Sequence, residues 1–219
     1  MEHLSAIAFA ARKSLAERGI SLSAGHSQQL AAAALGHNNL ASYQASGDDD
    51  GLAKASDIAL DRERLQARAD ALGHDPDAFE GALKATLEAR FPEAKVYGQE
   101  DDWLADTQLR FELAIVDDDR VNSQVAMTNG TFPRTDVELP WWGQLDEFDG
   151  EEDLAMDFDG LVSVDQDPDR VSWGEDIDVR GMLTVERFGR RLFGRRRVQI
   201  EHASLRWFGE SNEGDEARG

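Results

Sequence analysis

The second half of the chain alternates apolar and polar residues over three stretches, residues 154–165, 176–188 and 198–208. In the first stretch the even positions carry the large apolar side chains, which are Leu154, Met156, Phe158, Val162 and Val164. A period of two residues is typical of a β-strand with one buried and one exposed face. In the third stretch the apolar positions change parity near His202, which predicts a β-bulge there.

The chain up to residue 92 spaces its apolar side chains three and four positions apart, as an amphipathic helix does. This spacing predicts helices over residues 2–18, 26–35, 38–46, 61–72 and 76–90. Gly19, Gly36, Gly73 and Pro92 stand where these helices end. The acidic segment 47–51, GDDDG, has the composition of a linker.

A shorter alternation occupies residues 109–127. Its apolar positions are Leu109, Phe111, Leu113, Ile115, Val121, Val125 and Met127. The aspartates at 117–119 interrupt them, so this segment predicts two strands joined by a turn.

Together these patterns predict an α+β protein. A helical N-terminal part precedes an antiparallel β-meander, or an open barrel-like sandwich, of about five strands. We expect a small helical module at 1–46, a helical pair at 52–92, an antiparallel β domain at 107–209 and a frayed tail at 210–219.

Composition narrows the function classes. The chain carries a formal net charge of -21, which opposes general affinity for nucleic acid and favours a basic protein partner. It has no cysteine, which excludes disulfides and thiolate metal sites and is typical of a cytoplasmic protein. No stretch approaches the about 20 apolar residues of a membrane helix, and no signal-peptide pattern is present, so we expect no membrane association.

The helices at 26–35 and 38–46, with Gly36 between them, have roughly the order of a helix-turn-helix motif. The second helix contains no lysine or arginine, however. A DNA reader draws much of its affinity from phosphate contacts, so the sequence disfavours direct DNA binding.

The segment 21–43 carries His26, Leu30, Leu35, Gly36 and Leu40 in a fixed pattern. With these residues it resembles a short helical module at the front of some bacterial glyoxalase-related and mobile-element proteins. His37 departs from the aromatic residue usual at its position. The resemblance implies a bacterial or mobile-element origin, and no metal-binding glyoxalase pattern follows it in the chain.

The stretch 181–200 concentrates arginine in an otherwise acidic region. Arg195, Arg196 and Arg197 are central to it. One interpretation is structural, with an arginine-rich hairpin that neutralises neighbouring acidic strands. The other is an exposed surface that faces an anionic partner.

Two further groups are candidates for partner binding. Asp157, Asp159 and Asp165 fall on the exposed side of one predicted strand, where a basic partner could contact them. Trp141 and Trp142 lie in a proline-flanked loop, and form either a recognition hot spot or a lid on the β core.

Asp165, Asp167, Asp169 and Asp176 are spaced like the ligands of a calcium loop. Arg170 and Pro168 depart from that pattern, and an aspartate-rich turn is the alternative. Phosphate-loop, dinucleotide-binding and nucleophile-elbow motifs are absent from the sequence, so we predict no cofactor and favour a non-enzymatic protein.

Three hypotheses for function follow. The first is a non-catalytic interaction or regulatory protein of the bacterial cytoplasm that binds a basic protein. The second is a mimic of DNA that inhibits a nucleic-acid-binding protein. The third is a metal-dependent enzyme that uses the aspartate clusters.

Overall fold

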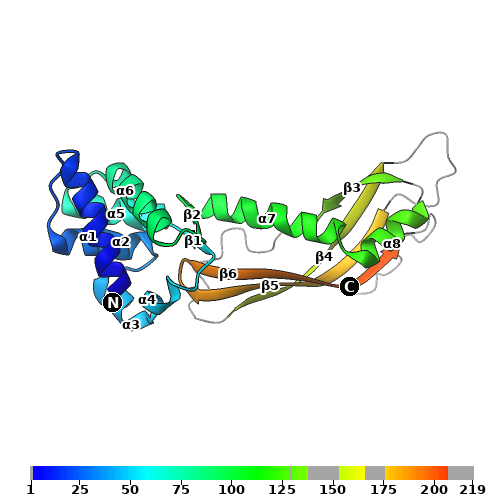
Figure 1. Ribbon diagram of the computed structural model, residues 1–219. Helices are drawn as coiled ribbons and strands as arrows, with labels where there is room; N and C mark the ends of the chain where they lie inside the picture. Colours follow the sequence, from blue (N-terminus) through cyan, green and yellow to red (C-terminus); the bar gives the residue numbers. More distant parts are fainter. Residues whose placement is uncertain (1, 129, 138–152, 166–175, 207–219) are drawn as a thin grey trace, which may run out of the picture. The chain divides into compact units, whose positions relative to one another are not determined.

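The computed structural model describes residues 2–128, 130–137, 153–165 and 176–206 (Figure 1). Its helices are α1 (Glu2–Glu17), α2 (Ala24–Ala34), α3 (Leu40–Ser46), α4 (Asp48–Gly51), α5 (Arg62–Leu72), α6 (Pro76–Arg90), α7 (Glu100–Val116) and α8 (Asp119–Thr128). Its strands are β1 (Asp57–Ala59), β2 (Lys95–Tyr97), β3 (Thr131–Asp136), β4 (Leu154–Asp165), β5 (Asp176–Gly189) and β6 (Leu192–Leu205). The predicted α+β class, with a helical N-terminal part followed by a sheet, is confirmed.

The strands form one mixed sheet in the order β2-β1-β6-β5-β4-β3. The last four strands neighbour one another in chain order, as in a meander. Strands β1 and β2 were not predicted from the sequence, because each has only three residues. They pair in parallel with each other, and β1 pairs antiparallel with the start of β6.

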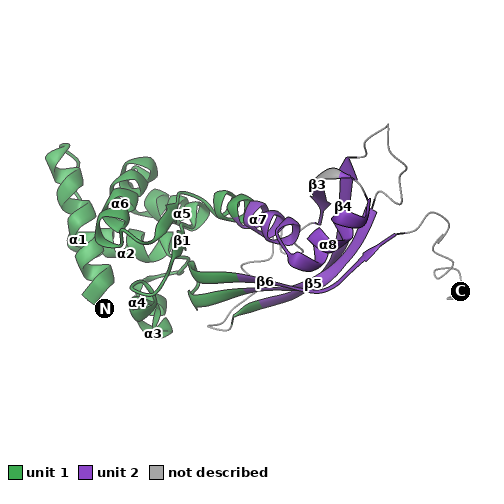
Figure 2. Cartoon of the chain, turned by 45° about the vertical axis from the view of Figure 1, so that its right-hand side comes forward, with its two compact units in different colours: residues 1–106, 143–154, 185–196 green, residues 107–142, 155–184, 197–219 purple. Residues whose placement is uncertain are grey.

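The chain divides into two compact units (Figure 2). Unit 1 comprises residues 1–106, 143–154 and 185–196, and unit 2 comprises residues 107–142, 155–184 and 197–219. Helix α7 and strands β4, β5 and β6 each contribute residues to both units.

Unit 1 buries the apolar faces of its helices against one another. The core includes Leu4, Ile7, Leu15, Leu30, Leu65, Phe79, Leu83 and Leu87. Side chains cap three of these helices, α2, α5 and α6: Ser23, Asp61 and Asp75 each accept hydrogen bonds from the first turn of the helix that follows. The predicted boundaries of these helices therefore agree closely with the structure.

Unit 2 packs helix residues on one face of its strands. Phe111 of α7 meets Phe158 of β4 edge to face, with 4.8 Å between the ring centroids. The even residues Leu154, Phe158, Val162 and Val164 of β4 are buried, as their parity predicts. On β5 the odd residues Ile177, Val179, Leu183 and Val185 are buried.

The prediction of strands over 109–127 is wrong, because this segment forms α7 and α8. The residues that α7 buries are three and four positions apart, namely Trp103, Leu104, Thr107, Phe111 and Ile115. Leu109 and Leu113 lie on the exposed side of the helix. Their alternation with Phe111 and Ile115 imitated a strand over seven residues, which is too short a window to distinguish the two periods.

The interpretation of 47–51 as a linker is also wrong. Residues Asp48–Gly51 form the short helix α4, and Asp48 and Asp49 are buried. A buried carboxylate needs hydrogen-bond partners, and here Leu4 and Arg190, which supply two of them, are distant in the sequence.

We predict that Gly51→Ala lowers the free energy of unfolding by about 1–3 kcal/mol. A Cβ atom at Gly51 would stand 2.1 Å from the carbonyl oxygen of Phe188, and that oxygen belongs to the backbone and cannot rotate away. The matched control is Gly81→Ala on α6, where a Cβ atom meets nothing within 4 Å. The control should raise stability by about 0.5–1 kcal/mol through helix propensity. Urea denaturation of both variants measures the difference, and equal effects would contradict the packing at Gly51.

Candidate functional site

The end of helix α2 positions His37. Gly36 adopts a left-handed conformation, with φ of 84°. The N–H of Gly36 then donates to Ala33 O at 2.9 Å and the N–H of His37 to Ala32 O at 3.0 Å. These bonds form a Schellman motif, which turns the chain sharply at the helix end. The turn carries His37 into the interior, where it is 1% exposed.

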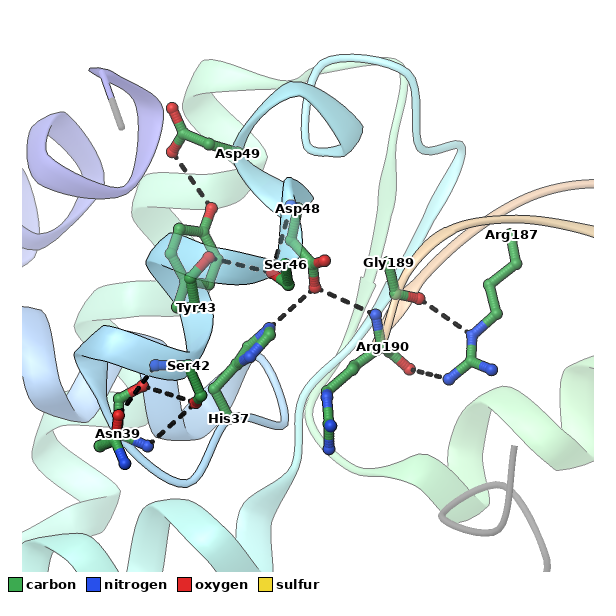
Figure 3. Close-up of polar contacts among 10 residues, drawn as sticks. All are labelled: His37, Asn39, Ser42, Tyr43, Ser46, Asp48, Asp49, Arg187, Gly189 and Arg190. Carbon is green, nitrogen blue, oxygen red and sulfur yellow. Dashed lines mark hydrogen bonds and ion pairs between the residues drawn. The ribbon is translucent and has the colours of Figure 1, made fainter. Parts of the chain in front are cut away.

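His37 meets Asp48 at the start of α4 (Figure 3). His37 Nε2 lies 2.8 Å from Asp48 Oδ2, and the two side chains are only 1% and 2% exposed. Burial raises the pKa of Asp48, but hydrogen bonds from His37, Ser46 and the Arg190 backbone outweigh burial and hold that pKa below its usual value. The ionised carboxylate of Asp48 can only accept hydrogen bonds. His37 Nε2 is therefore the protonated nitrogen of the ring and donates the hydrogen bond to Asp48.

The same oxygen of Asp48 binds the turn of the β5–β6 hairpin. The backbone N–H of Arg190 donates to Asp48 Oδ2 at 3.1 Å. A Cβ atom on Gly189 would stand 2.7 Å from Asp48 Cγ, so the turn approaches this closely because residue 189 is glycine. Arg187 closes the turn from within, because its Nε donates to Gly189 O at 3.1 Å.

The neighbouring carboxylate, Asp49, holds the start of α1. Asp49 Oδ1 accepts from Leu4 N at 2.9 Å and from the Tyr43 hydroxyl at 3.1 Å. Burial alone would raise the pKa of Asp49, but such hydrogen bonds lower it to about 2. Burial and the charge of Asp49 raise the pKa of Tyr43, so this hydroxyl stays protonated and donates.

Two arginines of β6 and its turn are buried in ion pairs within unit 1. Arg191 Nη2 lies 2.8 Å from Asp61 Oδ2, and Arg191 also pairs with Glu100. Arg196 lies 3.0 Å from Asp57 and 3.2 Å from Asp106, with its side chain 9% exposed.

The predicted arginine group is thus divided by strand parity. Arg196 points inward to its carboxylates, whereas Arg195 and Arg197 are exposed on the other face of β6. Strand alternation alone gives three consecutive arginines two different environments.

The predicted acidic group lies on the exposed face of β4. Asp157, Asp159 and Asp165 are all exposed. Asp159 pairs with Arg180 at 2.8 Å, and Asp165 pairs with Arg134 at 2.8 Å.

The remaining predicted site residues fall partly outside the described residues. Trp141, Trp142, Asp167 and Asp169 lie there. Asp176 begins β5 and accepts a hydrogen bond from the Ser163 hydroxyl at 2.6 Å. Within the part of the chain that the structure describes, no group of three or more His, Asp or Glu residues is placed to hold a metal ion.

Sequence reasoning missed the pair of His37 and Asp48. The available signal was His37 in place of an aromatic residue directly after Gly36, followed by the acidic run at 48–50. Neither feature specifies a contact, because Arg190, which completes it, lies 142 positions from Asp48.

A His–Asp pair can orient an imidazole for proton transfer when its second nitrogen reaches a substrate. Here His37 Nδ1 is buried and has no hydrogen-bond partner among the described residues. We therefore interpret the pair first as the contact that joins α2, α4 and the hairpin turn.

Comparisons with known proteins add no relative: no family model, curated protein or solved structure matches the chain. Among the described residues, no helix has the length and apolar character needed to cross a membrane.

We predict that Asp48→Ala costs about 3–5 kcal/mol of stability, because it leaves His37 Nε2 buried without its acceptor and also removes the carboxylate that binds Arg190 N. Asp48→Asn should cost less, since its amide oxygen still accepts both bonds without the charge. Asp50→Ala on the exposed side of the same helix is the control and should change stability by about 0.5 kcal/mol or less. Chemical denaturation tests the order, and an Asp48 effect no larger than that of Asp50 would refute it.

We predict that Arg196→Gln lowers the free energy of unfolding by about 3 kcal/mol, because Asp57 and Asp106 lose a buried cation. The melting temperature should fall accordingly. Arg195→Gln, one position away on the exposed face, should be nearly neutral. Differential scanning calorimetry of both variants makes the comparison. Equal melting temperatures would show that the hairpin arginines do not stabilise the fold through these pairs.

Proposed function

We propose that this chain is a non-catalytic acidic binding protein, and that unit 2 holds a basic segment of a partner protein against the outer face of α7. The partner segment is an amphipathic helix with lysine or arginine on one side and apolar residues on the other.

The observation that carries the proposal is a pair of exposed leucines. Leu109 and Leu113 are 55% and 51% exposed and stand one helical turn apart on α7. Met127 on α8 is also 51% exposed. Single exposed apolar residues are ordinary, but leucines aligned along a helix are the anchors that helix-in-groove recognition uses.

Charge at the end of α7 supports a basic partner. Asp117 and Asp119 are exposed within two turns of Leu113, and neither pairs with a cation among the described residues. The negative end of the helix dipole adds to the field at Asp117. With a formal net charge of -21 behind them, these carboxylates would attract and orient a cationic segment.

The exposed face of β4 is the other acidic surface of unit 2. Asp157 there has no ion pair among the described residues, whereas Asp159 and Asp165 each hold an arginine. This surface carries none of the large exposed apolar residues found on α7 and α8. We assign Asp157 a steering role and place the anchored contact on α7.

The test uses two fluorescent peptides of equal charge, a helical lysine–leucine peptide and a lysine–serine peptide. The whole protein should bind the first more tightly, with an affinity that falls as salt rises. Leu109→Ser combined with Leu113→Ser should weaken that binding about tenfold or more. Fluorescence anisotropy measures all of these affinities.

Phe9→Ser is the matched control, since Phe9 is an exposed apolar residue of unit 1, 58% exposed. It should leave peptide binding unchanged. Equal affinity for both peptides, or loss with Asp157→Asn but not with the leucine variant, would refute the contact on α7. The protein could instead bind no peptide and form a dimer that the double leucine variant abolishes. This result would identify a second copy of the chain as the partner and overturn the proposal.

A further inference from the structure

A cavity of about 310 Å³ lies in unit 1 between the end of α2 and helix α5. Its apolar wall consists of the alanines Ala33, Ala67 and Ala71, and its polar wall consists of His37, Asn38, Arg64 and Arg68. The polar wall therefore carries two guanidinium groups and no carboxylate. In a chain with nearly twice as many acidic as basic residues, 44 against 23, this is a local excess of positive charge.

Arg68 differs from the other arginines near it. Arg62, Arg64 and Arg191 each pair with at least one carboxylate. Arg68 is half-buried, and its Nη2 donates to the carbonyl oxygen of Asn38. No carboxylate pairs with it in the described parts of the chain. A partly desolvated guanidinium has donors left for a planar or tetrahedral oxyanion.

Asn38 and Arg64 hold Arg68 and the cavity wall in place. Arg64 donates from Nε to Asp61 at 2.9 Å and from Nη1 to Asn38 Oδ1. Because the backbone of Asn38 also accepts from Arg68, the two arginines are fixed to one loop. Their side chains are therefore ordered before any ligand arrives, which reduces the entropy lost on binding.

His37 lines the cavity, but both of its ring nitrogens are buried. Its Nε2 is committed to Asp48, and its Nδ1 is buried without a hydrogen-bond partner in the described residues. His37 therefore shapes the cavity wall, and the contact with a ligand falls to the arginines.

We propose that this cavity binds a small organic anion through a phosphate or carboxylate group held by Arg68, with Arg64 beside it. The volume is that of a small-molecule site, large enough for the oxyanion and a few carbon atoms against the three alanines. The two sources of the oxyanion, phosphate and carboxylate, share this chemistry. The site is in unit 1 and is independent of the surface proposed on α7.

The experiment titrates the whole protein with inorganic phosphate, glycerol phosphate and acetate, each against chloride at equal ionic strength. Amide NMR shifts report the location, and calorimetry reports the affinity. We expect saturable binding of at least one oxyanion, with the largest shifts at Ala33, His37, Asn38 and Arg68. Tighter binding of the phosphates or of acetate then identifies the group that the cavity accepts.

Arg68→Gln should weaken this binding about tenfold or more, because it removes a charge-assisted contact. Arg62→Gln, on the same helix but outside the cavity, is the matched control for charge and should leave it unchanged. Ala71→Leu leaves both arginines intact and fills the cavity, so it should also abolish binding. It keeps the test decisive if Arg68→Gln does not fold.

Three outcomes would overturn the proposal. One is that no oxyanion binds saturably, or that none binds more tightly than chloride does. Another is an equal loss of affinity in Arg62→Gln and Arg68→Gln, which would show general electrostatic attraction. The third is full affinity in a folded Ala71→Leu variant.

Discussion

The burial of one carboxylate, Asp48, determines how unit 1 is assembled. A buried charge without partners costs several kcal/mol of stability. The fold therefore tolerates Asp48 only when its carboxylate oxygens accept hydrogen bonds. His37 and the Arg190 backbone supply the donors, and they come from the end of α2 and the β5–β6 turn. The contact therefore joins the α2–α4 region to a hairpin turn that lies 142 positions away in the sequence.

Arginine side chains also join distant segments of this acidic protein through buried polar contacts. Arg187, Arg191 and Arg196 are buried or nearly so, and each is engaged by backbone carbonyls or carboxylates of unit 1. Guanidinium groups suit this role because they stay charged and offer several donors in fixed directions. These three arginines are consequently part of the folded interior, whereas Arg195 and Arg197 remain exposed on the other face of β6.

The two binding proposals depend on residues that take no part in these buried ion pairs and hydrogen bonds. Arg68 is a cation without a carboxylate among the described residues, beside a cavity. Leu109 and Leu113 are apolar groups that α7 leaves in solvent. Each of these groups lacks its ordinary partner among the described residues, and its chemistry indicates the class of ligand.

The sequence by itself determined the α+β class, the N-terminal helices and the faces of β4 and β5, because caps, glycine stops and strand parity act over a few residues. It also placed Asp157, Asp159 and Asp165 on an exposed face. Only the tertiary structure decided that residues 109–127 are helical, since which side chains are buried depends on the sheet beneath Phe111. The same holds for the site: His37 and Asp48 meet because Arg190 and Gly189 arrive from the far end of the chain, and a local pattern contains no information about such a partner.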